Sequence, residues 1–179
     1  MEPNETDTLT EDGHFYYFGF GSNLLQERLR LMNPSAEFVE SGVLHDFKLG
    51  FTGFSRHWQG AGATVYRCLG DDVWGVVWKM GVENSDSLDT QERSYRRLYV
   101  PVKLASTGRV VVCRTYQHRD VLHGDHKPSP HYKHVIVCGA IEHNLPHNYI
   151  EKLKAVADNG FRGKCGYDFS VLKHLNIEQ

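Results

Sequence analysis

The order of the expected elements predicts an α+β fold with a strongly curved sheet or a small barrel. Strand patterns cluster in the middle of the chain and helix patterns lie early and late, without the regular alternation of a doubly wound fold. The 179 residues are 40% hydrophobic, which suits one domain with a real core. We expect a disordered N-terminal tail over 1–13, which is rich in Glu, Asp and Thr, and a single domain over 14–179.

The first elements of this domain are a strand and a helix joined by glycines. Aromatic residues over 14–20 predict a buried strand. The segment 24–32 is typical of a helix, with Ser22 or Asn23 as its cap and Asn33-Pro34 as its stop.

Most of the sheet is expected between residues 43 and 118. After a strand over 43–51, the segments 63–69 and 73–80 predict a β-hairpin around Gly70-Asp71-Asp72. Both faces of the second arm carry apolar groups, which indicates an interior strand. Two more strands are expected over 98–104 and 109–118, the first at an edge or bulge because Pro101 cannot donate to a ladder.

The remaining elements are helical. A short helix is predicted over 85–92 with Ser85 or Ser87 as its cap, and later helices over 131–141 and from Pro146 to about residue 157. The sequence after Gly160 carries little signal beyond a short ordered segment at 171–175.

Charge and hydropathy exclude several classes of partner. Basic and acidic side chains number 20 and 22, without a basic run, so neither a nucleic acid nor an anionic membrane is expected as a partner. No apolar segment approaches the length of about 20 residues that a membrane span needs, and the N-terminus lacks the pattern of a secretory signal. A small, discrete ligand suits this surface better.

The cysteines and histidines do not predict a metal centre. The four cysteines, Cys68, Cys113, Cys138 and Cys165, lack the short spacings of metal knuckles or redox motifs and are expected to be reduced. Although there are 11 histidines, several of them dense between 118 and 134, no Cys or carboxylate pattern completes a tetrahedral set. We expect no metal, and the histidines are interpreted as solvated loop residues.

The segment Gly19-Phe20-Gly21-Ser22-Asn23 is a candidate ligand-binding turn. Glycines just after a strand let backbone N–H groups converge on one point, where they bind an anion or polarise a carbonyl oxygen. An ordinary tight turn with a serine cap accounts for it equally well. Nucleotide motifs do not fit, because Leu24 replaces the third glycine of the dinucleotide fingerprint and no Gly-Lys-Ser or Gly-Lys-Thr follows.

Glu92 is the candidate catalytic residue. It lies four residues after Leu88, so the two share one helical face, and a carboxylate that follows Leu88 towards the interior has its pKa raised by desolvation. That property suits a general base near neutral pH. The alternative is a surface carboxylate paired with Arg93, Arg96 or Arg97.

Eight segments, taken in order, resemble the γ-glutamylcyclotransferase family. They are YFGFGSNL at 17–24, NPSA at 33–36, DFKL at 46–49, DVWGVVWKM at 72–80, SLDTQE at 87–92, CRTY at 113–116, PSPHYK at 128–133 and EKLKA at 151–155. Any one of them could match by chance, but the ordered set is specific and covers most of the chain. The resemblance implies a mixed, barrel-like sheet with flanking helices and a cavity beside the glycine turn.

The resemblance also implies an activity, the conversion of γ-glutamyl amino acids or peptides to 5-oxoproline and a free amino acid. Glu92 matches the family's catalytic base, and the substrate-binding positions match Tyr17, Phe18, Gly19, Phe20, Gly21, Ser22, Asn23, Tyr116 and Tyr132. Asn23 favours the branch acting on γ-glutamyl amino acids, because the γ-glutamylamine branch usually carries Thr-Leu after the glycine. Members tend to be cytoplasmic, often form homodimers, and need no metal or cofactor.

Two departures from the family pattern leave alternatives open. Phe20 replaces a usual tyrosine and Arg93 a common glycine, so a catalytically silent protein that binds a γ-glutamyl ligand, or a scaffold on the same fold, is the second hypothesis. A hydrolase in which Glu92 activates water is the nearest enzymatic alternative. Without the resemblance, Tyr132 could face solvent and Tyr116 could be a core residue with a satisfied hydroxyl.

Overall fold

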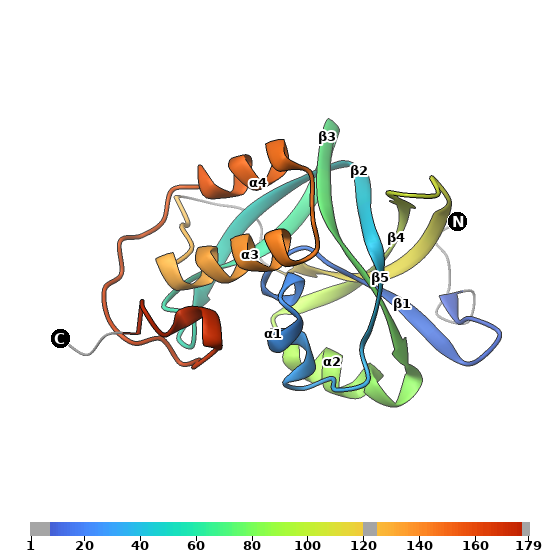
Figure 1. Cartoon of the computed structure of the whole chain (residues 1–179), viewed down its shortest axis with the longest axis horizontal. Helices are drawn as coiled ribbons and strands as arrows, with labels where there is room; N and C mark the ends of the chain where they lie inside the picture. Colours follow the sequence, from blue (N-terminus) through green and yellow to red (C-terminus); the bar gives the residue numbers. More distant parts are fainter. Residues whose placement is uncertain (1–7, 120–124, 177–179) are drawn as a thin grey trace.

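The computed structural model describes residues 8–119 and 125–176, which form a closed five-stranded barrel with helices around it (Figure 1). In the order β1-β3-β2-β4-β5, the strands are β1 (His14–Gly19), β3 (Gly60–Gly81), β2 (Glu37–Ser55), β4 (Tyr95–Leu104) and β5 (Val110–His118). The pair β1–β5 is parallel and the other pairs are antiparallel, so the sheet is mixed. The expected α+β, barrel-like fold is confirmed.

The helices of the described residues are short. They are η2 (Ser22–Leu24), α1 (Gln26–Arg30), η3 (Val82–Asn84), α2 (Ser85–Gln91), α3 (Pro130–Glu142), α4 (His147–Lys154) and η4 (Ser170–Leu172). Figure 1 shows α3, α4 and the C-terminal segment on one side of the barrel. Not one of these helices, in the part of the chain that is described, has the length and apolar character needed to cross a bilayer.

The predicted hairpin at 63–69 and 73–80 is wrong, because both segments belong to the single strand β3. Both pair with β2: Arg67 lies opposite Phe47, and Asp72 opposite His45. The residues between them form a bulge in which Gly70 has a φ of +83° and donates its N–H to Asp46 Oδ1 at 2.9 Å. The turn residues therefore bend one strand instead of reversing the chain.

The expected helix over 24–32 is broken near its start. Leu25 has extended dihedral angles, with φ −80° and ψ 121°, so the one-turn helix η2 ends there and α1 begins afterwards. Neither Ser22 nor Asn23 caps α1. The Asn23 side chain bonds instead to Tyr17 and Glu92 across the fold, which orients it towards the cavity described below. The predicted cap of α2 is also wrong, because Asn84 holds that position and makes no side-chain cap bond.

Other predictions from the pattern are confirmed. β4 pairs with β5 over nine positions but with β2 only at Leu104 and Lys103, so Pro101 lies where one side of β4 is free of a ladder. The helix α3 begins at Pro130, and the Ser129 hydroxyl accepts the Tyr132 N–H at 3.1 Å. All four cysteines are free thiols.

Part of the expected tail is ordered. Leu9 forms a β-bridge with Phe15, the Thr10 N–H donates to His14 O at 2.7 Å, and Lys79 pairs with Asp12 at 2.6 Å. The expectation of disorder is therefore wrong for residues 8–13, where a β-turn folds the chain back onto β1. Residues 1–7 lie outside the described part of the chain.

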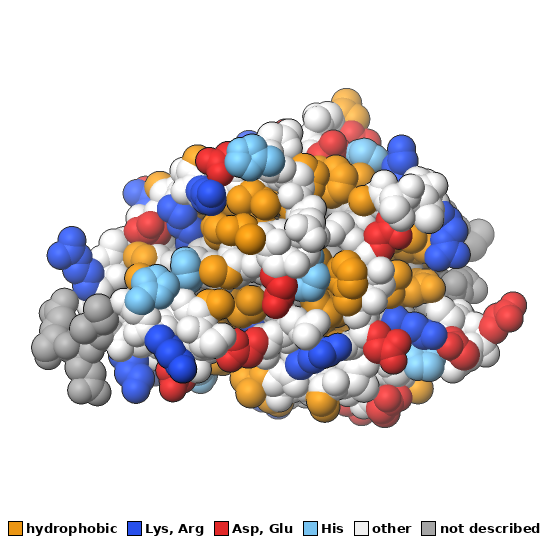
Figure 2. Space-filling view, viewed as in Figure 1, with side chains coloured by type: hydrophobic (Ala, Val, Ile, Leu, Met, Phe, Trp, Pro, Cys, Tyr) orange, Lys and Arg blue, Asp and Glu red, His pale blue; other side chains and the backbone are white. Residues whose placement is uncertain are grey.

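Charged side chains of both signs are mixed on one face of the molecule. On the face shown in Figure 2, the Lys and Arg side chains of the described residues are interspersed with Asp and Glu, and they form no continuous basic patch there.

Candidate functional site

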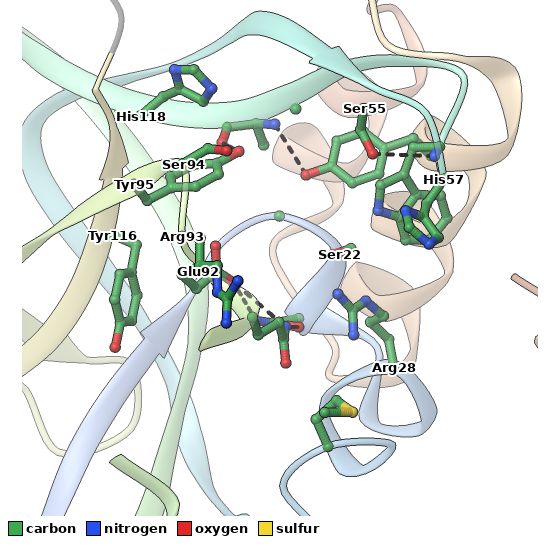
Figure 3. Close-up of a pocket in the computed structure, with 18 of the residues that line it drawn as sticks. Ser22, Arg28, Ser55, His57, Glu92, Arg93, Ser94, Tyr95, Tyr116 and His118 are labelled. Atoms are coloured by element: carbon green, nitrogen blue, oxygen red, sulfur yellow. Dashed lines mark hydrogen bonds between the residues drawn. The ribbon is translucent and has the colours of Figure 1, made fainter. Parts of the chain in front are cut away.

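A cavity of about 470 Å³ opens at one end of the barrel, beside the turn that follows β1 (Figure 3). Its wall comes from that turn, α1, the ends of β2 and β3, the residues after α2, β5, α3 and the C-terminal segment. This volume lies within the usual range of small-molecule sites, about 300–1,000 Å³. The expected cavity beside the glycine turn is therefore present.

Glu92 lies in this cavity wall, at the C-terminal end of α2. Leu88, one helical turn earlier, is completely buried, and the Glu92 N–H donates to its carbonyl at 3.0 Å. The Glu92 carbonyl in turn accepts the Tyr95 N–H at 2.8 Å, which fixes the exit into β4. The shared face of Leu88 and Glu92 directs the carboxylate inward, as the spacing predicts.

The environment of the Glu92 carboxylate suits proton transfer near neutral pH. Burial raises its pKa to about 7, against smaller opposing effects of the Arg28 charge and of hydrogen bonds from Asn23 and Gln91. Asn23 Nδ2 donates to Glu92 Oε1 at 3.2 Å and to the Tyr17 hydroxyl at 2.8 Å. Gln91 Nε2 donates to Asn23 Oδ1 at 2.9 Å, so the amide that faces the carboxylate is itself held in orientation.

The arginines after Glu92 do not neutralise it. Arg97 binds Asp89, Arg96 binds Gln117, and Arg93 is exposed at the rim of the cavity. The cation that does lower the Glu92 pKa is Arg28, which the sequence pattern does not single out. The interpretation of Glu92 as a surface ion-pair partner is therefore wrong.

The seven residues of the predicted binding segment divide into two groups. Tyr17, Phe20, Gly21, Ser22 and Asn23 line the cavity. Phe18 and Gly19 do not line it. Phe18 follows Tyr17 in β1, so its side chain points to the other face of the strand and is fully buried in the core. Gly19 pairs with Val76, and its carbonyl lies against Gly75.

Gly21 lies in close contact with two neighbouring elements. A Cβ atom at this position would lie 3.1 Å from both the Tyr132 hydroxyl and the Ala63 Cβ. The absence of a side chain therefore lets β3 and α3 approach the turn, which brings the Tyr132 hydroxyl against its backbone.

The two predicted tyrosines both line the cavity but have different partners. The Tyr132 hydroxyl accepts the Ala63 N–H at 3.0 Å. Burial raises the pKa of Tyr132 to about 12, partly offset by the backbone amides of Ala63 and Ser22. The Tyr116 hydroxyl instead donates to Asp89 Oδ1 at 2.6 Å, so Tyr116 combines a place in the cavity wall with a satisfied polar group.

Several cavity residues escape sequence reasoning. Tyr95 donates its hydroxyl to Ala63 O at 2.9 Å, and Trp58 and Tyr167 have ring centroids 4.4 Å apart. These side chains come from a strand start, a β-hairpin loop and the C-terminal segment, and their convergence depends on tertiary structure. Trp58 within a Gly- and Ser-rich loop is the one signal that could have suggested a ligand site.

A metal centre finds no support in the described residues, since no three His, Cys, Asp or Glu side chains converge there as ligands. His123, one of the dense histidines, lies outside the described residues.

Fold and site together define a small α+β barrel protein with a partly buried carboxylate in a cavity that is also lined by the turn after β1. Similarity to known proteins narrows this class. A model of the AIG2-like family matches residues 72–153. Gamma-glutamylcyclotransferase from Bos taurus is 43% identical over 166 residues, which cover 88% of this chain and 87% of the relative. Gamma-glutamylcyclotransferase from Mus musculus is 46% identical over 157 residues, which cover 84% and 82%.

A solved structure named Gamma-glutamyl cyclotransferase has a TM-score of 0.83 and 40% identity, covering 90% of this chain and 98% of its own. The chain therefore belongs to the γ-glutamylcyclotransferase family.

Proposed function

We propose that this protein is a γ-glutamylcyclotransferase, which releases an amino acid from a γ-glutamyl compound while the glutamyl part closes into 5-oxoproline. The observation that carries the proposal is the Glu92 carboxylate, whose pKa is about 7 and which lines the same cavity as the turn at 19–22. The similarity to γ-glutamylcyclotransferases over most of the chain supports the same reaction.

The substrate supplies its own nucleophile. Its α-amine attacks the γ-carbonyl carbon of the same glutamyl group, and folding the two together gives an effective molarity on the order of 10⁵–10⁸ M. Glu92 removes a proton from the α-ammonium, so that the nitrogen lone pair is free to attack. As the new C–N bond forms, Glu92 passes this first proton to the departing nitrogen, and the old amide C–N bond breaks. Glu92 then takes the second proton from the ring nitrogen, which leaves the neutral lactam, and releases it to the free amine as its ammonium form. No covalent enzyme intermediate is needed.

The carbonyl oxygen gains negative charge during this attack. The Gly21 backbone amide stabilises it directly, and the Ser22 amide acts through the Tyr132 hydroxyl to which it bonds; a direct donor contributes roughly 10²–10³ in rate. We include the Tyr132 hydroxyl in this group, because it is uncharged at neutral pH and lies against the same turn. The helix dipole adds little, because the helix that follows the turn is only a three-residue η2.

The two departures from the family pattern fit an active enzyme. Phe20 is buried in the cavity wall, and the hydroxyl it lacks relative to tyrosine is worth about 0.5–1.5 kcal/mol, which affects affinity more than turnover. Arg93 leaves the Glu92 pKa raised, because it is exposed and screened by solvent.

Incubation with γ-glutamyl-alanine tests the proposal. Cyclisation yields 5-oxoproline and alanine, whereas a hydrolase yields free glutamate and alanine. We expect Glu92→Gln to lower product formation by about 10²–10⁴ in a variant that stays folded and loses no stability. A parent protein that binds the dipeptide without turning it over, together with an indistinguishable Glu92→Gln variant, would establish the silent binding protein instead.

We further propose that the enzyme works in the cytoplasm on γ-glutamyl peptides, including those of glutathione metabolism, and forms a homodimer. The reaction needs only proton transfer and charge stabilisation, so activity should survive dialysis against a chelator.

A further inference from the structure

Arg28 presents a positive charge to the cavity without an ion pair or hydrogen bond to any described residue. Its side chain is only 6% exposed and lines the cavity, and its Nε atom makes no hydrogen bond. Its one specific contact is with Tyr167, whose ring centroid lies 4.9 Å from the guanidinium carbon. Among the described residues, no carboxylate forms an ion pair with it.

A buried guanidinium without an ion pair or hydrogen bond is unfavourable, because the loss of its hydration is not compensated by direct contacts. The Glu92 carboxylate attracts Arg28 through space but makes no ion pair with it, so the guanidinium keeps its hydrogen-bond donors for a ligand. The planar fork of Arg matches a carboxylate with two parallel hydrogen bonds. The cavity is therefore built to receive a carboxylate at its Arg28 end.

A γ-glutamyl amino acid offers two carboxylates, one beside the α-amine and one on the departing amino acid. The proton to be removed is on the α-amine, so the glutamyl carboxylate lies at the Glu92 end, where Arg93 is the nearby cation in Figure 3. In the same view, Arg28 and Arg93 are separate from each other, Arg93 next to Glu92 and Arg28 below Ser22. With the γ-carbonyl at the turn, the departing amino acid extends away from Glu92.

We propose that Arg28 binds the free carboxylate of the departing amino acid and thereby selects γ-glutamyl amino acids over compounds in which this carboxylate is absent or amidated. The inference rests on the proposed function and adds to it the residue that recognises the departing amino acid. Tyr167 packs on Trp58 and on His57, with centroids 4.4 and 5.6 Å apart, so an aromatic wall holds the guanidinium in place.

The test compares two substrates that differ only at this carboxylate, γ-glutamyl-alanine and γ-glutamyl-alaninamide. The parent and Arg28→Gln are assayed for 5-oxoproline over a range of pH, and each is compared on the plateau of its own pH profile, because loss of Arg28 raises the pKa of Glu92. We expect Arg28→Gln to lower kcat/KM for γ-glutamyl-alanine by about 10- to 100-fold, mainly through KM, and to change kcat/KM for the amide by less than about threefold.

For each substrate, the loss is the factor by which Arg28→Gln lowers kcat/KM relative to the parent. Because parent and variant act on the same leaving group, the different reactivities of alanine and alaninamide do not affect the comparison of the two losses. Arg30→Gln is the matched control, because Arg30 is on the same helix, is exposed, and binds Ala36 O outside the cavity. It should leave both kcat/KM values unchanged. Arg28→Lys should recover part of the preference, because it restores the charge without the fork.

Equal losses on both substrates would overturn the inference, since Arg28 would then act on the glutamyl half or on the fold. If Arg28→Gln had the same kcat/KM as the parent for both γ-glutamyl-alanine and its amide, the inference would be overturned as well. A parent that forms 5-oxoproline from neither substrate would instead refute the proposed function, so the two failures are distinguishable.

Discussion

At residue 92, the requirements of folding and of proton transfer oppose each other. Burial of the carboxylate raises its pKa to about 7, which suits a base that must both take and return a proton at neutral pH. The same burial makes the ionised form unfavourable in the folded state. Asn23 and Arg28 reduce this effect without removing it.

The first prediction concerns stability. The folded-state pKa of Glu92 lies above its ordinary value of 4.5, so ionisation opposes folding as the pH rises from about 4.5 to 7. Glu92→Gln should therefore be more stable than the parent at pH 8, by about 1–3 kcal/mol, and equally stable near pH 4.5. Urea unfolding at both pH values measures the difference. If Glu92→Gln were more stable than the parent by the same amount at pH 8 and at pH 4.5, the pKa of Glu92 would not be raised in the folded protein.

The second prediction concerns activity. Only ionised Glu92 accepts the substrate proton, so kcat/KM for γ-glutamyl-alanine should increase with pH, reach half its maximum near pH 7 and level off above about pH 8. An initial-rate profile at low substrate concentration measures this. A midpoint near the ordinary glutamate value would show that another group is the base.

At the scale of an element, α2 is fixed to the barrel through Asp89. The Asp89 carboxylate accepts hydrogen bonds from Arg97 on β4 and from the Tyr116 hydroxyl on β5, at 2.8 and 2.6 Å. Burial alone would raise the pKa of Asp89, but these two donors lower it below its ordinary value of 3.8. Because Glu92 follows one turn later, the position of the proposed base depends on this attachment.

The third prediction follows from that attachment. Asp89→Asn should lower the free energy of unfolding by about 1–3 kcal/mol at pH 7 and lower kcat/KM, because the end of α2 becomes less well fixed. The stability loss should shrink as the pH falls below 3.8, where the parent carboxylate is itself protonated. Asp86→Asn, exposed on the same helix, is the control and should change stability by less than about 1 kcal/mol.

At the scale of the whole molecule, distant parts of the chain meet at the turn after β1. Gly139, in the middle of α3, packs directly on the backbone of Leu24 and Leu25. A Cβ atom at Gly139 would lie 2.5 Å from the backbone of both residues. On the opposite side, the turn is supported by β3 through Gly75 and the Gly19 carbonyl.

The fourth prediction tests this contact. In an open helix, Gly→Ala is stabilising by about 1 kcal/mol, but here the added methyl group has no space. Gly139→Ala should instead destabilise the protein by about 1–3 kcal/mol and reduce activity, because α3 must move away from the turn. Thermal unfolding and a 5-oxoproline assay measure both effects, and a gain in stability would contradict the packing.

Features that depend on residues close together in the sequence are predicted better than contacts between distant segments. The inward direction of Glu92 follows from its spacing to Leu88, and the edge-like character of β4 from Pro101. The hairpin around Gly70 fails, because turn residues cannot reveal that both flanking segments pair with the same strand. The prediction that Phe18 binds substrate is wrong, because it treats the motif as a continuous segment although side chains alternate between the two faces of a strand. Arg28 escapes prediction from the sequence, because its place in the cavity depends on segments that are distant in sequence.

The C-terminal segment contributes Tyr167 to the cavity wall, and Gly166 attaches it by donating its N–H to His57 O at 2.6 Å. Phe169 and Leu172 are buried beside it. During synthesis, the turn, Glu92 and Tyr132 all leave the ribosome before this segment does. Until this segment packs against the barrel, the part of the wall formed by Tyr167 is missing, so enclosure of the proposed base depends on a contact made by residues far along the chain from Glu92.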